Sequence, residues 1–70
     1  MKKISLSRRI ENYLFKQNGW IHSGELERLA LQAGYKASNA GRRCREMQNE
    51  GILDRKEERG SVLYKYHVKA

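Results

Sequence analysis

The spacing of apolar residues changes once along the chain, just after Gly51, and this change limits the fold more than any other feature. Before Gly51, apolar side chains recur every three or four residues, as on one face of a helix. After Gly51 they alternate with polar side chains, as in a half-buried strand. The 70 residues suffice for a single small domain, residues 1–70. The pattern predicts an α+β domain in which helices precede a β-hairpin.

Three helices are expected before Gly51, over residues 7–18, 23–33 and 38–50, behind a basic N-terminal tail at residues 1–6. Each helix has a serine at its start that could cap free N–H groups, and each ends near a glycine. The expected caps are Ser7, Ser23 and Ser38, and the expected ends are Asn18-Gly19, Gly34 and Gly51. Trp20-Ile21-His22 reads as a short extended bridge. Phe15 lies off the apolar face of the first helix, so it would pack under the strands or be partly exposed.

The hairpin is expected over residues 52–68. Ile52-Leu53 opens its first strand, and the chain turns near Glu58-Arg59-Gly60. In the second strand Val62, Tyr64, Tyr66 and Val68 alternate with Leu63, Lys65, His67 and Lys69. The alternation favours core packing for Tyr64 and Tyr66. Trp20 is also expected in the core, although stacking on a nucleic-acid base is an alternative for these aromatic residues.

An apolar core has to hold this fold, since the sequence offers no covalent or metal crosslink. Cys44 is the only cysteine, and the histidines His22 and His67 have no ligand partners at zinc spacing. Cys44 is expected to be buried as a small hydrophobe, with redox sensing as the alternative. A free thiol fits a reducing interior, so we expect a cytoplasmic protein, nucleoid-associated if prokaryotic.

Several classes of function are excluded at this stage. The sequence has no apolar run that could span a bilayer, and the basic start is not followed by the apolar region of a secretory signal. It also has no Ser/His/Asp set, paired carboxylates or phosphate-binding glycine loop, and a domain this small encloses little of a substrate pocket. We therefore expect no enzymatic activity, no cofactor, no bound metal and no small-molecule ligand.

The formal net charge of +7 predicts a polyanionic partner. Nucleic acid is the commonest polyanion for a small basic domain, and an anionic membrane surface or an acidic protein are alternatives. The charge is uneven, because residues 23–35 alone are net acidic, with Arg28 against Glu25 and Glu27. That segment is the one least suited to run along a phosphate backbone.

The expected helix 38–50 separates apolar from basic residues. At about 100° per residue, Ala40, Cys44 and Met47 fall on one face. The opposite face carries Ser38, Arg42, Arg45 and Asn49, with Asn39, Glu46 and Arg43 at its flank and edge. Arginine binds guanine and asparagine binds adenine through paired hydrogen bonds. The alternative is a solvated face on which Glu46 pairs with Arg42.

Helices 23–33 and 38–50, joined by a tight turn, have the order of a helix-turn-helix. With a helix in front and a hairpin behind, residues 7–68 resemble the small phage and prokaryotic winged helix-turn-helix domains that bind DNA. The stretch "SGELERLALQAGYKASNAGRRCREMQNEGILDR" followed by "SVLYKY" carries this resemblance. The fold it implies is a three-helix bundle followed by a C-terminal β-hairpin wing.

The resemblance implies a monomer or weak homodimer on double-stranded DNA, acting as a sequence-selective transcriptional regulator. Helix 38–50 would enter the major groove, and the wing would reach an adjacent groove or the backbone. The implied DNA-binding residues are Ser23, Lys36, Ser38, Asn39, Arg42, Arg43, Arg45, Lys56 and Arg59. Glu57 and Glu58 depart from this pattern because they dilute the positive charge of the wing.

Two other functions stay open. One is a protein-interaction winged helix within a larger complex, which exposure of Phe15 or Tyr35 would favour. The other is binding to RNA or to left-handed DNA, although the wing lacks the adjacent prolines of left-handed DNA binders. Gly41 inside helix 38–50 costs about 1 kcal/mol relative to alanine. Glycine at this position is explained by close approach of helix 38–50 to a phosphate or to helix 23–33. The alternative is that the position tolerates many residue types.

Overall fold

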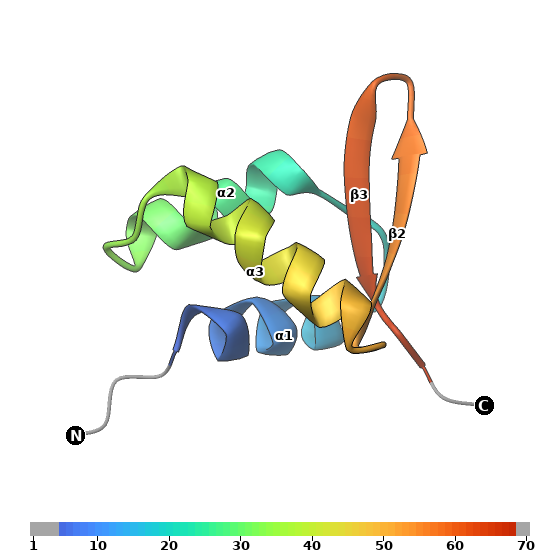
Figure 1. Cartoon of the computed structure of the whole chain (residues 1–70), viewed down its shortest axis with the longest axis horizontal. Helices are drawn as coiled ribbons and strands as arrows, with labels where there is room; N and C mark the ends of the chain where they lie inside the picture. Colours follow the sequence, from blue (N-terminus) through green and yellow to red (C-terminus); the bar gives the residue numbers. More distant parts are fainter. Residues whose placement is uncertain (1–4, 69–70) are drawn as a thin grey trace.

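The computed structural model describes residues 5–68, which form three helices and a three-stranded antiparallel sheet (Figure 1). This confirms the α+β class. The helices are α1 (Leu6–Gln17), α2 (Ser23–Gln32) and α3 (Ala37–Asn49), and the strands are β1 (Ile21–His22), β2 (Leu53–Glu58) and β3 (Ser61–Tyr66). The hairpin of β2 and β3 projects beyond the helices. The expected tail, residues 1–6, lies outside the described residues except for Ser5 and Leu6.

Helix α1 begins one residue earlier than expected, at Leu6, and Ser5 caps it instead of Ser7. The side-chain oxygen of Ser5 accepts a hydrogen bond from the backbone N–H of Arg8, at 3.2 Å. Leu6 is buried, so tertiary packing favours the longer helix. At the other end, Asn18 takes the left-handed conformation, with φ of 51°, which had been expected of the following glycine. Asparagine tolerates this conformation better than most residues.

The expected serine caps of the other two helices are also wrong. His22 and Lys36 are the N-cap residues, and neither side chain makes a capping hydrogen bond. Ser23 and Ser38 lie within the first turns of α2 and α3. For α2 the cause is the sheet, since His22 pairs with Leu63 and the extended backbone therefore continues up to the helix.

Gly34 and Gly51 end α2 and α3 as expected, and both have positive φ, at 88° and 82°. After each glycine the chain closes back on the helix. Tyr35 N–H donates to Ala30 C=O at 2.9 Å, and Ile52 N–H donates to Met47 C=O at 2.9 Å. These are Schellman-type ends, which need a residue without a Cβ at the left-handed position. They fix the turn between α2 and α3 and the path from α3 into β2.

The bridge at Trp20-Ile21-His22 enters the sheet, which sequence reasoning did not anticipate. Ile21 lies opposite Tyr64, so β1 pairs with β3 and the strand order is β1-β3-β2. The hairpin itself is confirmed, with Arg59 and Gly60 as its two turn residues at φ of 52° and 79°. Two consecutive positive φ angles are typical of a type I′ turn, whose twist matches that of the strands.

The core lies between the helices and one face of the sheet. Its buried members are Leu6, Ile10, Leu14, Leu26, Ala30, Ala40, Cys44, Met47, Leu53 and Tyr64. The inward face of α3 is therefore confirmed, as is core packing of Tyr64 and, half-buried, of Tyr66. Core packing of Trp20 is wrong, since this side chain is 37% exposed and lies outside the cluster. In residues 5–68, the helices are too short and too polar for a transmembrane span.

The revised start of α1 makes a prediction about stability. Ser5→Ala should lower the free energy of unfolding by about 1 kcal/mol, because it removes the oxygen that accepts from Arg8 N–H. Chemical denaturation monitored by circular dichroism measures this. Ser7→Ala is the matched control and should change stability little, since Ser7 lies inside the helix, where alanine is favourable. Equal losses in the two variants would contradict the assignment of the cap.

Candidate nucleic-acid interface

Helix α3 presents a polar face to solvent on the side opposite its buried residues. Ser38, Arg42, Arg45 and Asn49 are all exposed, as the helical spacing predicts. Within residues 5–68 no hydrogen bond or ion pair holds the guanidinium of Arg42. Arg45 donates from Nε to the backbone oxygen of Gly41, at 3.4 Å, which leaves its terminal amino groups available. These two arginines are positioned to contact a ligand.

The rest of the basic set on α3 lies on a different flank. Arg43 forms an ion pair with Glu46, with Nη1 3.1 Å from Oε1. The alternative pairing of Glu46 with Arg42 is therefore wrong. Asn39 is half-buried and lies one turn before Arg43 along the same flank. Asn39 and Arg43 thus lie on a flank separate from Arg42 and Arg45, as helical spacing predicts, although all four were expected to bind DNA.

A hollow of about 240 Å³ brings α3, α2 and the sheet together. It is lined by Gly41 and Arg45 of α3, Ser23 and Glu27 of α2, and Arg55, Val62 and Tyr64 of the sheet. Arg45 and Arg55 therefore face the same space as the carboxylate of Glu27, and Glu57 pairs with Arg55 on the same strand. The terminal amino groups of Arg45 are the part of this site best suited to an anionic group, because guanidinium groups form charge-assisted hydrogen bonds with anions.

Gly41 borders this hollow, and the geometry removes one explanation for it. A Cβ added at Gly41 would meet nothing within 4 Å, so close packing against α2 does not require glycine. The space in front of its backbone is open to solvent. A ligand approaching the helix at this point would find room there that a larger side chain would take.

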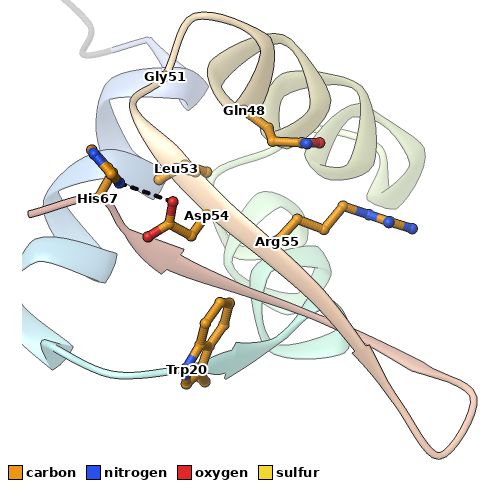
Figure 2. A pocket seen from close by; sticks show the side chains of 7 residues that line it. All are labelled: Trp20, Gln48, Gly51, Leu53, Asp54, Arg55 and His67. Carbon is orange, nitrogen blue, oxygen red and sulfur yellow. Dashed lines mark hydrogen bonds and ion pairs between the residues drawn. The ribbon is translucent and has the colours of Figure 1, made fainter.

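Arg55 is the site residue that sequence reasoning missed. It lies opposite Tyr64 in the sheet, and its guanidinium pairs with Glu57 at 2.8 Å. The hydrogen bond to Glu57, followed by that to Tyr64, raises the pKa of Arg55 above its usual value. Figure 2 shows Arg55 and Gln48 pointing to one side of β2, while Asp54 points to the other side, where it pairs with His67. Counting in twos from buried Leu53 would have placed Arg55 toward the helices.

The remaining predicted residues lie around the edges of this surface. Ser23 reaches the hollow, Lys36 is exposed at the start of α3, and Arg59 is exposed at the hairpin tip. Lys56 lies on the opposite face of the sheet, with Nζ 4.7 Å from the ring centre of Trp20 and 3.1 Å from Glu58. The structure brings Ser23 and Arg45 together with Arg55 and leaves Lys56 away from them.

Residues 5–68 offer little support for metal or thiol chemistry. They contain no group of three His, Cys, Asp or Glu side chains placed to hold a metal ion. Cys44 is buried against the core, and this burial raises its pKa from 9.0 to about 12. A thiol in this state is a poor nucleophile at neutral pH, because the thiolate is the reactive form.

The burial of Cys44 predicts slow alkylation. In the folded protein at pH 8, labelling with a small maleimide should proceed at least ten times more slowly than in the same protein unfolded in guanidinium chloride. Mass spectrometry over a time course measures both rates. Rapid labelling of the folded protein would show a reactive, accessible thiol and would revive the redox alternative.

Comparisons of this chain with protein-family models, with curated proteins and with solved structures found no match.

Proposed function

We propose that this chain is a winged helix-turn-helix protein that binds double-stranded DNA through α3 and the hairpin. The observation that carries the proposal is the hollow in which Arg45 of α3 and Arg55 of β2 face the same space beside Gly41. Arginines from two separate elements around an open, anion-sized space suit a phosphate of the DNA backbone. The net charge of +7 supports the same choice of partner.

In the proposed complex, α3 enters the major groove with the side chains of Arg42 and Arg45 directed toward the DNA. Arg55 and the free N–H groups at the start of α2, near Ser23, hold a phosphate at the edge of that groove. The hairpin tip carries Arg59 toward an adjacent groove or the backbone.

Selectivity among sequences then comes mainly from Arg42, which does not line the hollow and is free to meet bases. Regulation of transcription is the biological role this arrangement suits. Arg43 and Lys56 contribute less, because they do not line the hollow. Arg55 does line it, so a phosphate bound there would compete with Glu57 for its guanidinium.

One observation favours a second candidate, a protein-interaction winged helix. Phe15 is 64% exposed, which was the feature expected of a domain that docks onto another protein. The polar, basic face of α3 would then meet an acidic protein surface. Binding to structured RNA is a third possibility, and a competition between RNA and ordinary duplex DNA separates it from the proposed function.

The first test is fluorescence anisotropy of a labelled random DNA duplex titrated with the protein at several salt concentrations. For about five phosphate contacts, log affinity should fall against log salt with a slope near −4 to −5. A folded protein that shows no binding even at low salt would contradict the proposal. Binding at this slope would justify selecting a preferred site from a random library.

Substitutions at the arginines test the proposed orientation. Arg45→Ala and Arg55→Ala should each weaken DNA binding by about 1–3 kcal/mol, since both line the hollow. Arg43→Ala is the matched control, because it removes the same charge from α3 but from the flank paired with Glu46. Arg43→Ala should weaken the free energy of DNA binding by less than half as much as Arg45→Ala does. If Arg43→Ala weakened binding as strongly as Arg45→Ala, the orientation of α3 would be wrong.

The hairpin tip offers a separate test, because Arg59 takes a positive φ that its side chain disfavours. Arg59→Asn should raise the free energy of unfolding by about 1 kcal/mol, since asparagine tolerates this conformation. The same substitution should weaken DNA binding by removing a cation from the tip. Thermal denaturation and anisotropy measure the two effects. A variant that is more stable but binds DNA unchanged would exclude the tip from the interface.

A further inference from the structure

A groove at the base of the hairpin is unlike the rest of the surface. It lies where α1, the end of α3 and the end of β3 meet, at the other end of the hairpin from the turn at Arg59-Gly60 (Figure 1). Its volume is about 380 Å³. It is lined by Glu11, Phe15, Glu50, Gly51, Ile52, Tyr66, His67 and Val68, and is called the basal groove below.

The apolar side chains of the basal groove are unusually exposed. Phe15 and Val68 are 64% and 63% exposed. The ring of Phe15 meets Tyr66 edge to face, with ring centres 5.1 Å apart, so both expectations for Phe15 hold: it contacts the last strand and stays open to solvent. Exposed apolar side chains gathered in one groove mark a surface that a partner covers.

The charge of the basal groove is opposite to that of the whole chain. Two carboxylates, Glu11 and Glu50, line it, and neither has an ion-pair partner among residues 5–68. Lysine and arginine are missing from the described lining, although they outnumber acidic residues in the sequence by 15 to 8. An occupant that complements this groove therefore carries apolar side chains next to cationic ones.

The chain itself contains a segment of this composition, Met1-Lys2-Lys3-Ile4. We propose that the basal groove binds residues 1–4 of a second copy of this chain. Apolar Met1 and Ile4 suit Phe15 and Val68, and the two lysines suit the two carboxylates.

The same segment of the same chain could reach only part of the basal groove. Four extended residues span about 14 Å. Along α1, the ten residue steps from Ser5 to Phe15 already cover about 15 Å, and Val68 lies outside α1, after β3. A second copy has no such restriction.

This contact joins two different surfaces, so two copies can exchange segments reciprocally, or each copy can bind the next in a longer array. In either case, a segment that precedes the start of α1 in one copy binds beyond the middle of α1 in another. The basal groove is formed at the base of the hairpin, whereas the proposed DNA contacts use the outward face of α3 and the hairpin tip. Copies bound to neighbouring DNA sites could therefore contact one another, a consequence that rests on the proposed function.

The self-association itself can be tested without DNA. Sedimentation equilibrium of the full chain at rising concentration, in near-physiological salt, should show species larger than a monomer. Phe15→Ser should raise the dissociation constant about ten-fold or more. Leu31→Ser is the matched control, because Leu31 is an equally exposed leucine, at 60%, on α2 and outside the groove. Its dissociation constant should stay within two-fold of the unmodified chain.

Charge reversal tests which segment occupies the basal groove. Glu11→Lys with Glu50→Lys should abolish self-association, and Lys2→Glu with Lys3→Glu should do the same. Combining all four substitutions should restore it, since the charges are then complementary again. Circular dichroism checks that each variant is folded. The proposal would be overturned if the unmodified chain stayed monomeric, or if the variant with all four substitutions did not regain self-association.

Measuring the cooperativity of DNA binding distinguishes failure of this inference from failure of the proposed function. On a duplex long enough for several copies, the unmodified chain should bind with a Hill coefficient above one. Phe15→Ser should bind non-cooperatively with unchanged affinity for a single-site duplex. DNA binding by a non-cooperative monomer would overturn the inference alone. If self-association changed with the charge reversals as expected but the chain did not bind DNA, the inference would be supported and the proposed function overturned.

Discussion

Burial of Tyr64 is the constraint that places the proposed interface. Tyr64 lies on the central strand, opposite Ile21 of β1 and Arg55 of β2, and it is 3% exposed. Residues directly opposite each other in a sheet share a face. When Tyr64 packs into the core, Arg55 must also point toward the helices. A guanidinium is too costly to bury without partners, so Arg55 emerges at the hollow beside Arg45 and not within the core.

The position of α3 depends on two glycines instead of on long side chains. Gly34 closes the end of α2 and sets where α3 begins, and Gly51 closes α3 and directs the chain into β2. Each turn is fixed by backbone hydrogen bonds that only a left-handed residue permits. A short helix with the small inward residues Ala40 and Cys44 can then sit close to the core while its arginines stay in solvent.

Sequence reasoning succeeded where a local pattern reports burial. The spacing of Ala40, Cys44 and Met47 gave the orientation of α3. Alternation gave the burial of Tyr64 in β3 but not that of Leu63, which is buried on the opposite face. It failed where a distant partner decides. The start of α2 depends on pairing between His22 and Leu63, which lie far apart in the sequence. The position of Trp20 beside Lys56 depends on the same sheet.

The site was predicted only in part for a related reason, since helical spacing shows which residues face outward but not which neighbours they meet. Helical spacing set Arg43 at the edge of the outward face but paired Glu46 with Arg42, whereas in the structure Glu46 pairs with Arg43. Arg55 was overlooked because its place beside α3 follows from strand register.

The distribution of ion pairs then decides which surface is effectively cationic. Carboxylates from the same element partly neutralise Arg43, Arg55 and Lys56, so these residues add less to the field that a polyanion meets. Arg42 has no such partner among residues 5–68, and Arg45 bonds only to a backbone oxygen. Glu11 and Glu50, at the other end of the hairpin from its tip, have no ion-pair partner within the described residues 5–68. A chain of net charge +7 thus has a basic outward face on α3 and an acidic groove at the base of the hairpin, and the proposed DNA binding and self-association would use one each.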